Sequence, residues 1–222
     1  LPVDGRFTMA NMAIEAGGKN GIIAPDDKTQ AYVRARTRAP YEPVYGDADA
    51  KVDREYRYDA ASFEPCVAEP HSPARYARAK DRKATQLDSA YIGSCTGGKI
   101  TDFLAAARIL KGRKVKIDTF LVPATVEVAE ALITTQLGGT SLVEIFAAAG
   151  CQDIAPPSCA ACLGGPEDTY GRTSGKEVVI STTNRNFIGR MGSKKAQIYL
   201  ASPLTVAASA LTGHITDPRE FM

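Results

Sequence analysis

Short apolar runs alternate with helical patterns through the second part of the sequence. Four runs read as buried strands, over residues 90–93, 119–122, 177–180 and 197–200. Between and after them, apolar residues recur at helical spacing from Ile100 to just before Gly112, through 126–135, through 141–149 and from Pro203 to Gly213. This alternation predicts an α/β layer structure with a mainly parallel sheet.

The first part of the sequence is less regular. It predicts one helix over residues 8–16, ended by glycines, and another over 30–38, followed by loop with short strands over 41–70. We therefore expect residues 1–75 to be the second part of one α/β domain. Residues 76–86 would form a linker, within a basic run from Arg75 to Lys83 that we interpret as solvated surface. Residues 87–222 would form a more complete α/β domain.

Residues able to do chemistry follow the predicted strands. Cys95 comes after the first strand, residues 123–125 after the second and residues 182–185 after the third. The carboxyl ends of parallel strands lie at one edge of a sheet, and ligands bind there. We therefore expect these residues to lie along one edge.

The five cysteines favour bound metal or unpaired thiols, because an odd number does not indicate a secreted disulfide framework. Cys159 and Cys162 form a C-x-x-C, which alone fits half a zinc site, a redox pair or an iron–sulfur site. Cys95 offers a third thiolate, and neither histidine has ligand-like spacing. Cys66 and Cys151 are interpreted as packed thiols.

Three thiolates without an evident fourth ligand would leave one metal position open, which is typical of catalytic sites. Cys95 lies in Gly-Ser-Cys-Thr-Gly-Gly between a predicted strand and helix, where the helix N-terminus favours the thiolate. The same segment also fits a nucleophilic cysteine or an anion-binding loop.

Composition narrows the class of protein. The chain has 222 residues, 44% of them hydrophobic and 23% charged, as in ordinary globular proteins, and its net charge of +2 argues against nucleic-acid binding. No apolar run is long enough to span a bilayer, and no signal or transit pattern opens the sequence. Because it begins Leu-Pro-Val-Asp without Met, we interpret it as a processed product, a fragment or part of a longer chain.

Four segments together resemble the aconitase superfamily. They are residues 11–17 (Asn-Met-Ala-Ile-Glu-Ala-Gly), 93–96 (Gly-Ser-Cys-Thr), 158–164 (Ser-Cys-Ala-Ala-Cys-Leu-Gly) and 181–192, which contains Asn-Arg-Asn-Phe-Ile-Gly-Arg. They occur in the order found in the superfamily, and the resemblance covers essentially the whole chain. It is greatest to the isopropylmalate dehydratase branch of plant and algal type. Gly97 departs from the wider superfamily, where Asn is common.

The resemblance implies a fold, a cofactor and residue roles. The fold would be aconitase-like, three-layer α/β/α, in the second half of a large subunit. The cofactor would be a [4Fe-4S] cluster bound by Cys95, Cys159 and Cys162. The remaining roles fall to five residues: Asn11 and Asn184 lining the cluster and its bound hydroxyl, Glu15 moving protons, and Arg185 and Arg190 binding substrate carboxylates.

The implied reaction interconverts 2-isopropylmalate and 3-isopropylmalate by dehydration and rehydration, in leucine biosynthesis. The implied partners are a small subunit with a swivelling domain that carries a serine base, and the N-terminal half of the same large subunit, without which the chain would be inactive. Homoaconitate, citrate and methylthioalkylmalate stay open as substrates, and a cluster-free RNA-binding protein or a structural zinc module as other classes. The location would be the chloroplast stroma for a plant or algal protein, and otherwise the cytoplasm.

Overall fold

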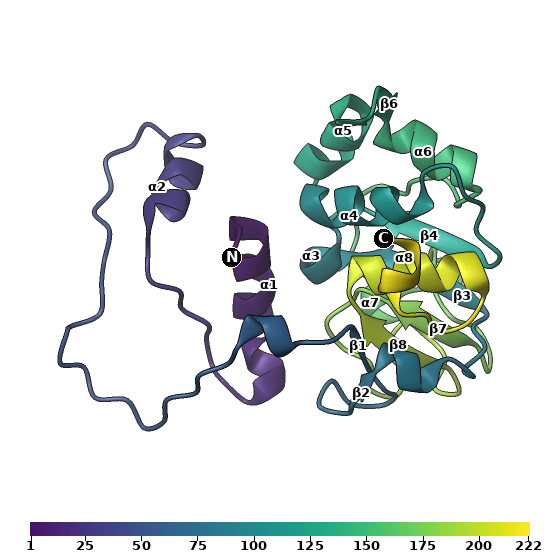
Figure 1. The fold of residues 1–222 in the computed structure, drawn as a ribbon, viewed down its shortest axis with the longest axis horizontal. Coiled ribbons are helices and arrows are strands. Elements are labelled where there is room, and N and C mark those ends of the chain that lie inside the picture. The colour runs from purple at the N-terminus through teal and green to yellow at the C-terminus, as the bar shows by residue number, and fades with distance from the viewer. The chain divides into compact units, whose positions relative to one another are not determined.

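A computed structural model describes residues 1–222 and divides the chain into two units, Leu1–Glu64 and Pro65–Met222. The first unit contains α1 (Val3–Met12), a 3-10 turn (Ala13–Ala16), α2 (Asp27–Arg34) and a short 3-10 turn (Ala60–Ser62). Between α2 and that last turn, the chain forms neither helix nor strand (Figure 1). No residue of this unit is buried.

The two helices of the first unit are joined by an ion pair, by a hydrogen bond from Arg6 to the Thr29 hydroxyl at 2.8 Å and by one ring contact. Asp26 is the N-cap of α2 and accepts a hydrogen bond from the Thr29 amide at 3.0 Å. The Arg6 guanidinium on α1 donates to both oxygens of the same carboxylate, at 2.8 and 2.5 Å. The rings of Phe7 and Tyr32 meet edge to face at 5.5 Å. These contacts fix the local pairing of α1 and α2 without forming a core.

The second unit is built on a six-stranded sheet with the order β2-β1-β8-β7-β3-β4. Its strands are β1 (Cys66–Ala68), β2 (Tyr76–Arg78), β3 (Ser89–Gly93), β4 (Asp118–Val122), β7 (Val178–Ser181) and β8 (Gln197–Ala201). The four strands from β8 to β4 are parallel, whereas β1 runs antiparallel to both β2 and β8. The predicted α/β fold with a mainly parallel sheet is therefore confirmed.

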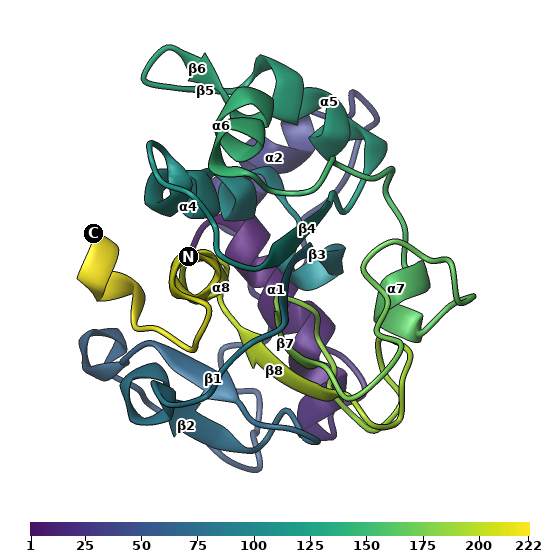
Figure 2. The same cartoon turned by 90° about the vertical axis from the view of Figure 1, so that its right-hand side faces the viewer.

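Helices cover the two faces of this sheet unequally. On one face lie α4 (Ile100–Leu110) and α8 (Pro203–Thr212), with α5 (Val126–Thr134) and α6 (Leu142–Ala149) packed beyond α4 (Figure 2). A small hairpin, β5 (Gln136–Leu137) and β6 (Thr140–Ser141), joins α5 to α6. The other face carries only α7 (Ala160–Leu163) and loops (Figure 2).

The side chains of the strands alternate between these two faces, as a pleated strand requires. On β3, Ala90 and Ile92 join the larger apolar core beneath α4, α6 and α8, and Tyr91 joins the smaller core on the loop-covered face. On β7, Ile180 lies in the larger core and Val179 in the smaller one. Because both faces are covered, these strands are apolar at almost every position, which explains why they were visible in the sequence.

The expected boundary between domains differs from the one observed. Residues 76–86, expected as a linker, hold β2 and a 3-10 turn (Ala79–Arg82) and belong to the second unit, because β2 pairs with β1 and β1 pairs with β8. Part of the basic run is paired here. Arg82 forms an ion pair with Glu69, and Lys83 forms another with Glu220 at 3.3 Å. No helix in the structure has the length and apolar character needed to cross a membrane.

Candidate functional site: a thiol site where the strand order reverses

The connections of the parallel strands turn in opposite directions on either side of β3. The chain passes from β3 through α4 to β4 on one side, and later returns to β7 on the other side before continuing to β8. The carboxyl ends of β3 and β7 therefore flank a topological switch point, where open α/β sheets bind ligands. Cys95 follows β3, and Asn184 and Arg185 follow β7.

A sharp turn presents Cys95 directly after β3. Ser94 has φ 72°, in the left-handed region that non-glycine residues seldom adopt, and α3 (Ser94–Gly97) begins at once. The turn fits tightly against its neighbours, since a Cβ added at Gly93 would lie 2.6 Å from the Val122 carbonyl oxygen. Cys95 itself is exposed. A strained, closely packed turn that exposes a thiol is typical of a functional position.

Thr182 joins this turn to the end of β7. Its hydroxyl donates to the Gly93 carbonyl at 2.8 Å and accepts from the Gly93 amide at 2.8 Å. Its carbonyl accepts from the Thr96 hydroxyl at 2.8 Å. These contacts of Thr182 could not be predicted, because nothing in the sequence pattern shows which strands are neighbours.

Lys99 holds the same turn from the other side. Its ammonium group donates to the Thr96 carbonyl at 2.8 Å and to the Cys95 carbonyl at 3.4 Å, and it pairs with Asp102 at 3.0 Å. The Lys99 side chain is 10% exposed. A positive charge is thus fixed beneath the Cys95 turn, which the sequence analysis also did not anticipate.

The C-x-x-C segment packs against the loop that carries Arg190. Cys159 is the N-cap of α7 and is exposed, whereas Cys162 is buried within α7. Gly164 ends α7 with φ 73°, and a Cβ there would come within 2.9 Å of the Gly189 carbonyl oxygen. This close approach places α7 directly beside the turn that contains Arg190.

Cys162 lies among the groups that the sequence singled out. Its sulfur is 3.7 Å from the Asn184 Oδ1 atom and 3.7 Å from the Arg190 Nη2 atom. Burial raises the pKa of the Cys162 thiol, the Arg190 guanidinium lowers it, and charge on Cys95 and Cys159 raises it.

Two further side chains build the loops around this site. Asn186 is fully buried, and its amide nitrogen donates to the carbonyls of Glu69 at 2.8 Å and Ile198 at 2.9 Å. Arg172 donates to the Gly165 carbonyl at 2.7 Å, just after α7. Asn186 anchors the loop after β7, and Arg172 anchors the loop after α7.

The predicted site residues divide between the two units. Cys95, Cys159, Cys162, Asn184, Arg185 and Arg190 belong to the second unit, and the structure brings Cys162 into contact with Asn184 and Arg190. Asn11 and Glu15 belong to the first unit, at the end of α1 and in the following 3-10 turn, where both are half-buried. Cys151, interpreted as a packed thiol, contacts the larger core, and burial raises its pKa to about 12.

The thiols fit an iron–sulfur cluster by their chemistry. No group of three or more metal-ligating side chains converges in this structure, and there is no disulfide. Cys95 and Cys159 are exposed, so their side chains can change rotamer toward a ligand. The candidate ligands are cysteine sulfur atoms, and iron–sulfur clusters prefer such soft sulfur ligands.

The fold and the site define an open α/β domain in which Cys162 contacts Asn184 and Arg190 near the switch point of the sheet. The sequence matches the Aconitase family (aconitate hydratase) over residues 1–86 and 74–213, so this chain belongs to the aconitase family. The family resemblance inferred from the four motifs is confirmed.

Individual relatives agree with this assignment. The chain is 55% identical over 227 residues to the chloroplastic 3-isopropylmalate dehydratase large subunit of Arabidopsis thaliana, covering 100% of this chain and 45% of that protein. It is 47% identical to the probable methanogen homoaconitase large subunit of Methanosarcina mazei (100% and 54% covered) and 44% identical to the 3-isopropylmalate dehydratase large subunit of Heliobacterium modesticaldum (99% and 51% covered). The chain spans about half the length of these curated relatives.

Proposed function

We propose that this chain is the C-terminal portion of the large subunit of a [4Fe-4S] hydro-lyase that interconverts 2-isopropylmalate and 3-isopropylmalate. The observation that carries the proposal is the position of Cys162, with an amide oxygen and a guanidinium both 3.7 Å from its sulfur at the switch point of the sheet. The names of the Arabidopsis and Heliobacterium relatives supply the substrate.

In this proposal, the thiolates of Cys95, Cys159 and Cys162 would hold the cluster. The bound cluster supplies a Lewis acid toward the hydroxyl and carboxylate of the substrate, with no net redox change. The preference of iron–sulfur clusters for thiolate ligands supports this assignment, as does the position of Cys162 beside Asn184 and Arg190.

The arginines orient the substrate. Arg185 and Arg190 each present a planar guanidinium to a carboxylate, a geometry that allows two parallel hydrogen bonds. Arg190 lies beside Cys162, so a carboxylate held there would be close to the metal site. Asn184 and Asn11 would donate amide hydrogen bonds to the departing hydroxyl, and Glu15 would move its proton.

The reaction removes water and adds it back at the neighbouring carbon. A proton leaves the carbon next to the hydroxyl-bearing carbon, the C–O bond breaks, and an alkene forms. Water then returns with the hydroxyl on the other carbon. In the family pattern, the base that takes the carbon-bound proton is a serine of the small subunit, so the proposed partners are that subunit and the upstream half of the large subunit.

The test is an assay of the assembled enzyme. The full large subunit would be co-purified anaerobically with its small subunit, and alkene formation followed by ultraviolet absorbance with 2-isopropylmalate, homocitrate and citrate. Turnover of 2-isopropylmalate alone is expected. Turnover of homocitrate instead would favour homoaconitase activity, which the Methanosarcina relative's name keeps as a second candidate.

A charge-conserving variant sharpens this test. Arg190→Lys keeps the charge but loses the two-pronged hydrogen bond, and should reduce kcat/KM by about 10- to 100-fold, as expected for loss of one hydrogen bond to a charged group. Arg113→Lys, on a loop after α4, is the matched control and should change little. Equal activity of both variants would remove Arg190 from the proposed site.

For a plant or algal protein, we propose the chloroplast stroma as its location, as in the name of the Arabidopsis relative.

A further inference from the structure

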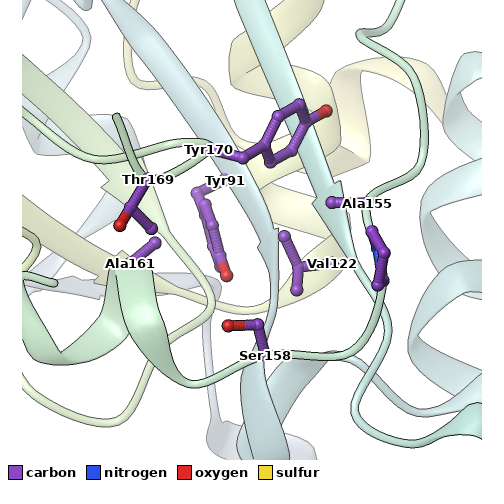
Figure 3. Close-up of a pocket in the computed structure, with 8 residues that line it drawn as sticks. Tyr91, Val122, Ala155, Ser158, Ala161, Thr169 and Tyr170 are labelled. Carbon is purple, nitrogen blue, oxygen red and sulfur yellow. The ribbon is translucent and has the colours of Figure 1, made fainter. Parts of the chain in front are cut away.

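A small apolar cavity lies behind the C-x-x-C segment. It has a volume of about 250 Å³ and is lined by Tyr91, Val122, Ala155, Pro156, Ser158, Ala161, Thr169 and Tyr170 (Figure 3). Ser158 precedes Cys159 in the chain, and Ala161 precedes Cys162. The cavity therefore borders the segment that carries two of the three thiols.

Tyr91 brings an unsatisfied hydroxyl into this cavity. The residue lies on β3, is 1% exposed, and its hydroxyl makes no hydrogen bond. Figure 3 shows the hydroxyl end of the ring directed toward Ser158. Burial raises the pKa of Tyr91, and charge on Cys162 and Cys159 raises it further, so the phenol stays protonated and can act as a donor.

Two other hydroxyls of the cavity wall, those of Tyr170 and Ser158, take part in hydrogen bonds. Tyr170 donates to the Asp153 carbonyl, and the Ser158 hydroxyl accepts from the Ala160 amide at 3.0 Å. Buried polar groups nearly always have partners, so an isolated tyrosine hydroxyl needs an explanation. Ser158 and Ala161, which line the cavity together with Tyr91, directly precede Cys159 and Cys162 in the chain, so the sulfur atoms of these two cysteines are the candidates for an acceptor.

The ring of Tyr91 is held firmly in this orientation. A Cβ added at Gly171 would lie 2.9 Å from two of its ring carbons, and a Cβ added at Gly93 would lie 2.9 Å from a third. Because both positions are glycine, the backbone of β3 at Gly93 and the loop at Gly171 can both pack directly against the ring. A rigid ring gives the hydroxyl a fixed position, which a useful hydrogen bond requires.

We propose that the Tyr91 hydroxyl is a positioning and tuning group that donates a hydrogen bond to the sulfur atoms of the bound iron–sulfur cluster or its cysteine ligands. This inference rests on the proposed function. Hydrogen bonds to the sulfurs and exclusion of water are two of the factors that set the reduction potential of such clusters. A single neutral donor in an otherwise apolar cavity would stabilise the more negative, reduced form.

The test compares Tyr91→Phe with Tyr170→Phe in the holoenzyme. Both variants remove the hydroxyl of a tyrosine that lines the cavity, but the Tyr170 hydroxyl points away from Tyr91 and has a carbonyl partner, and its ring packs edge to face on Phe120 at 5.0 Å. Three quantities would be measured: iron and sulfide content, the reduction potential of the cluster, and the shift of the Fe–S(Cys) stretching bands between H₂O and D₂O.

Tyr91→Phe should shift the potential to a more negative value, lose part of the D₂O shift and lose iron several-fold faster in air, whereas Tyr170→Phe should match the unmodified protein. A folded Tyr91→Phe protein that fails to load a cluster also supports the proposal, since only the hydroxyl is gone. If Tyr91→Phe does not fold, 3-fluorotyrosine at position 91, a stronger donor, should shift the potential to a less negative value.

Two results would overturn the inference in different ways. A loaded Tyr91→Phe cluster with unchanged potential and D₂O shift would refute the role of Tyr91 and leave the proposed function intact. Unmodified protein without iron and sulfide would refute the proposed function, and the inference would fall with it.

Discussion

The two units of this chain differ in what holds them together. Residues 1–64 contain no buried side chain, yet they carry thirteen of the twenty large hydrophobic side chains that are exposed. Residues 65–222 contain every buried residue, arranged in two cores on opposite faces of one sheet. Because burial of apolar surface is the main stabilising contribution to folding, the second unit has its own source of stability and the first does not.

The largest expected effect separates the two units physically. Residues 65–222 alone should unfold in one cooperative transition on heating, whereas residues 1–64 alone should show no cooperative transition, because no core exists to be lost. Circular dichroism during thermal unfolding measures both. Cooperative unfolding of the 1–64 fragment would show that the first unit has a stabilising core of its own.

A matched pair of phenylalanines tests the same contrast within the whole chain. Phe103 on α4 is fully buried and meets Phe146 edge to face at 5.8 Å, whereas Phe63 is 66% exposed. Phe103→Ala should lower the free energy of unfolding of the second unit by about 3–5 kcal/mol, as large-to-small core substitutions do. Phe63→Ala should change it by less than about 0.5 kcal/mol. Denaturant unfolding gives both values, and similar losses would contradict the assignment of the core.

The tight turn at Cys95 should be sensitive to a single methyl group. A Cβ at Gly97 would overlap the Thr182 side chain, so Gly97→Ala must displace the turn from the end of β7. We expect a loss of about 1–3 kcal/mol in the free energy of unfolding, the usual cost of overpacking. Gly46→Ala, in the first unit with open space around it, is the control and should have almost no effect. Equal Tm values for the two variants would rule out the close contact.

The smallest effect concerns pH. Burial raises the pKa of the Cys151 thiol from 9.0 to about 12 in the folded state. The folded protein therefore keeps a proton that the unfolded chain releases, and this contribution to stability is complete below pH 9.0 and is lost as pH rises toward about 12. Cys151→Ser should lessen that loss of stability.

The reactivity of the thiols gives a separate check. Alkylation at pH 8 should modify exposed Cys66 before Cys151, and the reverse order would contradict the burial of Cys151.

The second unit was readable from the sequence because its strands are buried on both faces. The predicted runs 90–93 and 119–122 correspond to β3 and β4 within one residue, and the last helix was marked by its Ser202 cap and Pro203. In contrast, β1 and β2 have three residues each, with one buried position apiece, which is too short for a period to appear. The expected linker over 76–86 arose from that missing signal.

Part of the candidate site could be predicted from residue type and spacing. Cysteines and the Asn-Arg motif stand out by type and spacing, so the residues around Cys162 were anticipated. The contacts of Thr182 and the burial of the Tyr91 hydroxyl depend on which strands are neighbours and on which face a side chain lies. These are properties of the folded sheet, and no local pattern in the sequence carries them.

The central claim is that the thiols of the second unit bind an iron–sulfur cluster. It is tested most directly by iron, sulfide and zinc analysis of the full large subunit purified anaerobically, compared with Cys159→Ser and with Cys151→Ser as the matched control. About four irons and four sulfides per chain are expected in the unmodified protein and in Cys151→Ser, with loss in Cys159→Ser. Stoichiometric zinc, or no metal in the unmodified protein, would contradict the account.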